Sequence, residues 1–115
     1  MLRYERDYIM RMIAAAAAAV ARLRERLTGG ASGDEIVRAA RAAQTDLLGN
    51  EAALLRALDS ASAVHAIGDP ERVQAWVDLL RVEADANRAA GDANTAAAID
   101  LRADTLSAAA KKVVE

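Results

Sequence analysis

Residues 12–21 read MIAAAAAAVA, and these ten residues contain no charged side chain. Alanine is the strongest helix former and is depleted in strands. Apolar residues recur at steps of three and four through and beyond this stretch, at Ile9, Ile13, Ala16, Val20, Leu23 and Leu27. This spacing aligns them along one side of a helix. The sequence therefore predicts a long, alanine-rich helix over about residues 3–28.

The rest of the chain has the same helical composition. It contains 115 residues, of which 54% are hydrophobic and only 3% aromatic, with one Pro, six Gly and no Phe. This composition lacks the turn residues and aromatic residues of β-sandwiches and barrels. The length is that of a single domain with an ordinary hydrophobic core. We therefore expect an all-α fold in one domain, residues 1–115.

Turn signals divide the chain after the first helix. Gly29–Asp34 is a loop, and Gly49-Asn50, Gly68-Asp69-Pro70 and Gly91-Asp92 are compact stops. Glycine suits the end of one helix, while Asp or Asn caps the start of the next. Five antiparallel helices are predicted, over 3–28, 35–48, 51–67, 70–90 and 93–113. They form a helical bundle or a stack of helical hairpins, with hairpins over about 35–67 and 70–113.

Each later helix also has one apolar stripe. The helix over 70–90 carries Val73, Trp76, Val77, Leu80 and Ala84, and the helix over 51–67 carries Leu54, Leu55, Leu58, Ala61, Val64 and His65. We expect these stripes to form the core.

The first helix has a second face of small residues, formed by Met10, Ala14, Ala17 and Ala21. A helix that is apolar on two sides needs two partners. An alternative interaction face carries Tyr8, Met12 and Ala16. We therefore expect a protein–protein interaction or scaffolding domain that forms a homodimer through this helix, with a helical peptide as another partner that such a face could receive.

Two resemblances accompany this pattern. The segment from Asp7 to Ile13, DYIMRMI, resembles the N-terminal signature of a family of small bacterial helical proteins of unknown function. The C-terminal half resembles a tetratricopeptide hairpin, with Trp76-x-x-Leu79 and Ala97-x-x-x-Leu101 at the positions of its motif. The interval from Trp76 to Ala97 departs from that repeat, because the helix that starts at residue 70 is about one turn too long. The first resemblance implies nothing about activity, and the second implies tetratricopeptide-like helical-hairpin packing.

Several kinds of site are excluded by the composition. The chain has no cysteine and one histidine, which excludes thiolate metal sites and sites with several histidines in one chain. The Glu-x-x-His motif of di-metal helical bundles does not occur. The glycine-rich loop has no lysine and follows a helix, unlike a phosphate-binding loop. We expect no metal, no cofactor and no enzymatic activity.

An alternative function is a small-ligand binder or enzyme with a polar pocket near His65, Glu83 and Asn87. Asp100 and Asp104 form an i, i+4 pair, which is typical of a solvated helix face.

Charge suggests a third function. Net charge is −2, but the first 28 residues hold six Arg and three acids, whereas the chain from Asp69 onward is acidic. Arg residues beside Tyr4 and Tyr8 could contact RNA or an anionic membrane surface. We expect neither nucleic acid nor a membrane as a partner, because isolated arginines on helices are usually solvated.

The apolar run of the first helix is too short to cross a bilayer. Glu5 and Asp7 lie where a secretory signal would be basic. The sequence therefore favours a cytoplasmic protein.

Overall fold

The computed structural model describes residues 3–114, and within them all regular structure is helical. The elements are α1 (Arg3–Thr28), α2 (Gly33–Leu48), the 3₁₀ helix η1 (Gly49–Glu51), α3 (Ala52–Ala57), α4 (Ser60–Ile67), α5 (Pro70–Ala89) and α6 (Ala93–Val114). The prediction of an all-α helical bundle is confirmed. The long first helix has the predicted bounds.

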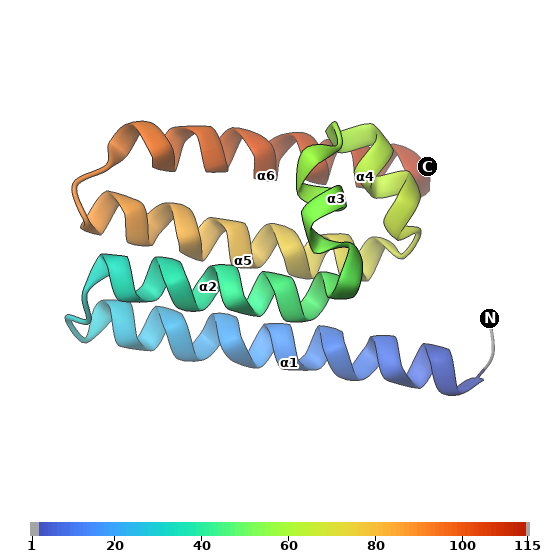
Figure 1. Cartoon of the computed structure of the whole chain (residues 1–115), viewed down its shortest axis with the longest axis horizontal. Helices are drawn as coiled ribbons and strands as arrows, with labels where there is room; N and C mark the ends of the chain where they lie inside the picture. The colour runs from blue at the N-terminus through green and yellow to red at the C-terminus, as the bar shows by residue number, and fades with distance from the viewer. Residues whose placement is uncertain (1–2, 115) are drawn as a thin grey trace.

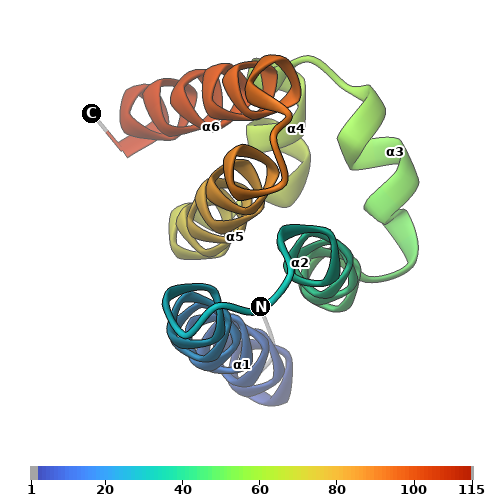
Figure 2. The same ribbon diagram turned by 90° about the vertical axis from the view of Figure 1, so that its left-hand side faces the viewer.

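Two antiparallel hairpins make up most of the fold. Figure 1 shows α1 and α2 forming one hairpin and α5 and α6 the other, while the short helices α3 and α4 lie across one end. Helix α5 is central, because it contacts α1, α2, α4 and α6. Figure 2 shows α1 and α6 on opposite sides of α5.

The central position of α5 explains its burial. The predicted stripe from Val73 to Ala84 is buried, as expected. Residues outside that stripe are buried too, at Ala75, Leu79, Val82 and Ala86. The reason is that partners pack against several sides of α5, so a single stripe is too narrow a description of this helix. Trp76, at 1% exposure, is the largest fully buried side chain.

The segment predicted as one helix over 51–67 is divided. Leu58 and Asp59 both adopt extended backbone conformations, with ψ of 152° and 162°. The Asp59 carboxylate accepts a hydrogen bond from Ser62 N at 3.3 Å and so caps a new helix. Aspartate competes with helix continuation in this way. The expected hairpin over 35–67 therefore does not form, and α4 packs against α6 and α5 instead.

This break also changes which residues are buried. Leu55 and Val64 lie in the core as the stripe predicts. Leu54 is 55% exposed, and Ala61 and His65 are exposed, so these three stripe positions are wrong. The two short helices have different axes, and one stripe cannot run along both.

Two of the predicted caps are confirmed. Asp69 accepts a hydrogen bond from Glu71 N at 2.9 Å, and Pro70 occupies the first helical position after it. Asp92 accepts one from Thr95 N at 3.1 Å at the start of α6. Asn50 was expected to cap a helix as well, but it lies inside η1. These polar caps satisfy amide groups that have no partner inside the helix.

The start of α2 packs directly on the backbone of α5. Gly33 is the first residue of α2 and is buried. A Cβ atom at this position would lie 2.4 Å from the carbonyl oxygen of Ala86 and 2.8 Å from the amide nitrogen of Ala90. Only glycine allows so close an approach of the two helices.

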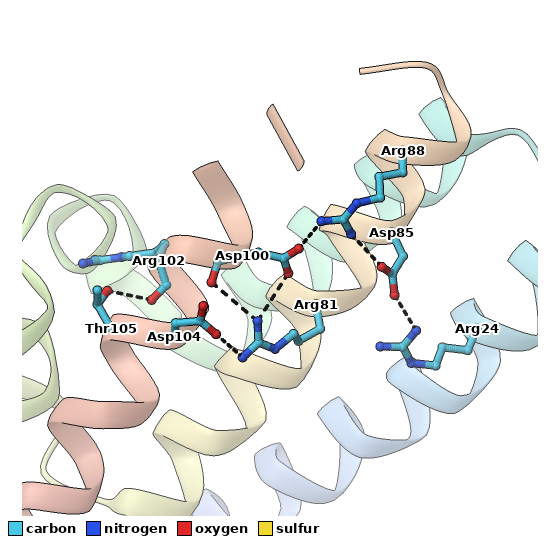
Figure 3. Close-up of polar contacts among 8 residues, drawn as sticks. All are labelled: Arg24, Arg81, Asp85, Arg88, Asp100, Arg102, Asp104 and Thr105. Carbon is cyan, nitrogen blue, oxygen red and sulfur yellow. Dashed lines mark hydrogen bonds and ion pairs between the residues drawn. The ribbon is translucent and has the colours of Figure 1, made fainter. Parts of the chain in front are cut away.

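Surface ion pairs join the three long helices α1, α5 and α6, as Figure 3 shows. Arg24 of α1 lies 2.9 Å from the carboxylate of Asp85 on α5. Asp85 also pairs with Arg88, at 3.0 Å, and Arg88 reaches Asp100 on α6. These successive ion pairs therefore link α1 to α6 across α5.

The predicted solvated pair on α6 is part of this network. Arg81 of α5 pairs with Asp104 at 2.7 Å and with Asp100 at 3.3 Å. Asp104 is exposed, as a solvated face predicts, and Asp100 is partly exposed, but both aspartates also pair with arginines of α5. Hydrogen bonds and charge from Arg88 and then Arg81 lower the pKa of Asp100.

Candidate functional site

The first candidate site is the outer α1 face, which consists of Met10, Ala14, Ala17 and Ala21. All four residues are exposed in the single chain, with Met10 at 44%. Tyr8, on the alternative face of the helix, is 56% exposed. The opposite side of the same helix is buried at Ala16, Ala19 and Leu23. Helix α1 is therefore apolar both toward the core and toward solvent.

The alternative face of α1 is used inside the chain. Ala16 is buried at 4% exposure, and the half-buried Met12 packs against the same core cluster. Only Tyr8 of that set remains largely exposed. The structure thus brings together Met10, Ala14, Ala17 and Ala21 as one solvent-facing stripe and separates them from Met12 and Ala16.

The outer α1 face has a shallow groove on either side. One, of about 510 Å³, lies between α1 and α2 and is lined largely by alanines, among them Ala15, Ala18 and Ala42. The other, of about 250 Å³, lies between α1 and α5, where Ala17 joins Ile13. The small-residue surface of α1 therefore continues onto both of its neighbours.

The second candidate site differs from the predicted polar pocket. His65 is exposed on α4 and does not line the groove that contains Glu83. Asn87 is buried, but its side-chain amide donates to the backbone carbonyl of Glu83 in its own helix, at 2.9 Å. Of the three predicted residues, only Glu83 lines this groove. The expectation that all three form one pocket is wrong.

The α2–α6 groove is a depression of about 370 Å³ over the middle of α5. Helices α2 and α6 both pack against α5 and do not contact each other. The space that this leaves between α2 and α6 is the groove, and α5 forms its floor. Residues from four helices line it: Arg41, Gln44, Arg56, Trp76, Leu80, Glu83, Thr95, Ala98, Ile99 and Arg102.

A chain of hydrogen bonds forms the floor of the α2–α6 groove. Trp76 Nε1 donates to Gln44 Oε1 at 3.2 Å, and Gln44 Nε2 donates to Glu83 Oε1 at 2.7 Å. The other carboxylate oxygen of Glu83 lies 3.3 Å from Arg41 Nη1. Each polar group in this buried chain has a partner, which is what burial of polar groups requires.

Three guanidinium groups surround that floor. Arg56 Nη2 donates to the Arg41 carbonyl oxygen at 3.1 Å. Arg102 donates to Ser60 Oγ at 2.9 Å and to the Leu55 carbonyl oxygen at 3.0 Å. These acceptors are neutral, so neither arginine is neutralised by them.

Arg102 also lies over the Trp76 ring, 5.3 Å from its centroid, in a cation–π contact. Burial lowers the pKa of both Arg56 and Arg102, and the positive charge of Arg41 lowers that of Arg56 further. The negative charges of Glu83 and Asp59 act in the opposite direction on Arg56 and Arg102 respectively and offset only part of this lowering.

Sequence reasoning identified Glu83 but none of these arginines. Arg41, Arg56 and Arg102 belong to three different helices and form no local pattern. The only signal for this groove in the sequence was Trp76. The apolar stripe predicts that Trp76 points into the interior, and Trp76 forms part of the groove floor on α5.

The basic bias of α1 has a partial explanation within the chain. Arg24 pairs with Asp85 on α5, and Arg26 pairs with Glu35 on α2. These pairs join α1 to the acidic side chains beside it. They leave less of the α1 charge to attract RNA or lipid.

Comparison with protein families, with curated proteins and with solved structures finds no match to this chain. The two resemblances noted in the sequence therefore remain predictions. Across residues 3–114, no helix is both long enough and apolar enough to cross a membrane. The same residues contain no group of three or more His, Asp or Glu side chains placed to hold a metal ion.

Proposed function

We propose that this chain is a non-enzymatic interaction domain that forms a homodimer through the outer α1 face. One observation carries the proposal: Met10, Ala14, Ala17 and Ala21 are exposed at helical spacing, while the opposite side of α1 is already packed in the core. A solvated helix surface normally carries charged and polar residues. Three turns of exposed small apolar side chains are typical of a surface that another helix covers.

The spacing of the stripe favours a second copy of α1 as the partner. Steps of four, three and four between the stripe residues are those of a helix-pairing seam. An antiparallel arrangement aligns Met10 with Ala21 of the second copy, and Ala14 with Ala17. Alanines at such a seam allow the helix axes to approach to about 8 Å, the close end of the usual range.

Charge at the two ends of the seam supports the antiparallel direction. Asp7 and Arg24 are exposed and continue the stripe, one turn before Met10 and one turn after Ala21. In the antiparallel register each Asp7 lies opposite Arg24 of the second copy. A parallel pair would instead place Asp7 against Asp7, which is unfavourable. The two residues lie about 25 Å apart along one helix, so they cannot pair within a chain.

The first experiment measures mass in solution by size-exclusion chromatography with light scattering, over a concentration series. We expect a dimer for the natural sequence and a monomer for Ala17→Glu, because that carboxylate would be buried in the seam. Ala97→Glu, at an exposed position on α6, is the matched control and should remain dimeric. A monomeric natural chain, or a dimeric Ala17→Glu, would contradict the proposal.

A charge exchange tests the direction of pairing. Asp7→Arg alone and Arg24→Asp alone should each weaken the dimer, and the two together should restore it. Arg24→Asp also removes the pair with Asp85, so Asp85→Asn serves as the control for that loss. It should leave the dimer intact. Failure of the double variant to recover the dimer would exclude the antiparallel register.

A further inference from the structure

We infer that the α2–α6 groove binds a small organic anion, held by the guanidinium groups of Arg41, Arg56 and Arg102 against the wall formed by Leu80 and Ile99. This site is separate from the outer α1 face, and the inference does not depend on dimer formation. No residue of α1 lines the groove.

Charge is the first argument. Three arginines and a single carboxylate, Glu83, line the groove, so its lining has an excess of two positive charges. Glu83 cannot neutralise all three, because its oxygens are held by Gln44 at 2.7 Å and by Arg41 at 3.3 Å. Arg81 and Arg88 on the α5–α6 surface each pair with two carboxylates, whereas Arg56 and Arg102 have no carboxylate partner among the described residues. The lining of the α2–α6 groove therefore keeps an excess of positive charge, with two arginines that no carboxylate pairs.

An unused donor is the second argument. Among the described residues, the one buried side-chain nitrogen or oxygen without a hydrogen-bond partner is Arg56 Nε. An unpaired buried donor is costly, and a charged donor more so. The same guanidinium is destabilised by the neighbouring Arg41, whose charge lowers its pKa. An oxyanion in the groove would reduce the repulsion between the two arginines, and a movement of the Arg56 side chain toward it would give the buried N–H an acceptor.

The groove also limits what kind of anion fits. Its volume of about 370 Å³ is that of a small metabolite rather than a macromolecular segment. Guanidinium groups recognise planar carboxylates and phosphates through paired N–H donors. Leu80, Ala98 and Ile99 provide an apolar wall beside these donors. The ligand class is thus a small carboxylate or phosphate with a short apolar part.

Trp76 provides a natural reporter for binding. It is the only tryptophan in the chain, its indole forms part of the groove floor, and Arg102 stacks on it. An anion that attracts Arg102 changes the electrostatic environment of the indole ring. Trp76 fluorescence should therefore respond to binding without any added label.

The experiment titrates the full chain with inorganic phosphate, with butyl phosphate and with succinate, at constant ionic strength maintained with KCl. We expect a saturable change in Trp76 fluorescence, together with a shift of the Arg56 Nε–H resonance in a ¹⁵N-correlated NMR spectrum. Preference for one probe identifies phosphate or carboxylate as the ligand. Absence of a saturable response to all three probes would overturn the inference.

Variants distinguish the groove from general charge screening. Arg41→Gln should weaken binding about tenfold, because one charge-assisted hydrogen bond is lost. The substitution also removes the ion pair to the buried Glu83, so circular dichroism is used to check that the variant is folded. Arg102→Lys preserves the charge but not the paired donors and should weaken binding as well. Arg22→Gln, an exposed arginine of α1, is the matched control. Equal weakening by Arg22→Gln and Arg41→Gln would contradict a specific site.

Discussion

The side-chain amide of Gln44 donates to the carboxylate of Glu83 over 2.7 Å, and this contact joins α2 to α5 inside the fold. Gln44 is 1% exposed and Glu83 is 3% exposed. The amide oxygen of Gln44 is also used, as the acceptor for the Trp76 indole. One glutamine therefore satisfies two buried polar groups of α5. It restricts α2 to a single position along that helix.

Replacing Gln44 with Leu should lower the free energy of unfolding by about 1–3 kcal/mol, because Trp76 Nε1 loses its acceptor and Glu83 loses a donor in the interior. Chemical denaturation monitored by circular dichroism measures this change. Gln74→Leu is the control, since Gln74 is exposed on α5 and its side chain donates to Asp78 of its own helix. Equal effects of the two substitutions would mean that the buried contact has no special role.

Gly33→Ala should destabilise the fold by about 1–3 kcal/mol, the usual range for overpacking. The added methyl group would lie 2.4 Å from the Ala86 carbonyl oxygen, which belongs to a backbone that cannot move without shifting α5. Thermal unfolding measures the effect. Gly29→Ala is the control, because a Cβ there is 3.3 Å from its nearest neighbour. A stable Gly33→Ala protein would show that α2 and α5 can separate freely at this end.

Stability should decrease as the pH falls below about 4, the ordinary pKa of an aspartate in an unfolded chain. Arg88 and Arg81 lower the pKa of Asp100 in the folded state, so the unfolded chain binds a proton more readily in this range. The stabilisation is complete above the unfolded pKa and is lost as pH falls through the lower, folded pKa. Melting temperature measured between pH 2 and pH 6 follows this loss.

Asp100→Asn should reduce that dependence, because the carboxylate that titrates is then absent. Asp46→Asn, at an exposed position on α2, is the comparison. If the melting curves of Asp100→Asn and of the natural protein have the same pH dependence, the α5–α6 ion pairs do not cause it.

The helix boundaries that the sequence predicts well are those with local signals. Asp69 and Pro70 start α5 through an N-cap and a proline at the first position, and both act within a few residues. The break at Leu58 and Asp59 has no glycine or proline. This break depends on the packing of α4 against α5 and α6. A single aspartate within an apolar pattern does not predict such packing. The error over 51–67 therefore comes from tertiary packing.

The two candidate sites also differ in how far local sequence signals predict them. Met10, Ala14, Ala17 and Ala21 lie on one helix, and their spacing alone predicts a common face. Whether this face or the one with Ala16 is exposed depends on how α2 and α5 cover α1. The three arginines of the α2–α6 groove are even less accessible to sequence reasoning, because they come from three helices. The sequence likewise predicts Gly33 to be part of a loop. Its role in the close packing of α2 on α5 is seen only in its proximity to the Ala86 backbone.

The central place of α5 determines the order in which the fold can be completed during synthesis. The ribosome releases α1 and α2 well before Pro70–Ala89, the segment on which both of them pack. Until α5 emerges, Leu23 and Ile36 lack the part of their cover that Val82 and Ala86 of α5 provide. The nascent α1–α2 hairpin therefore keeps part of its apolar surface exposed until α5 has been synthesised.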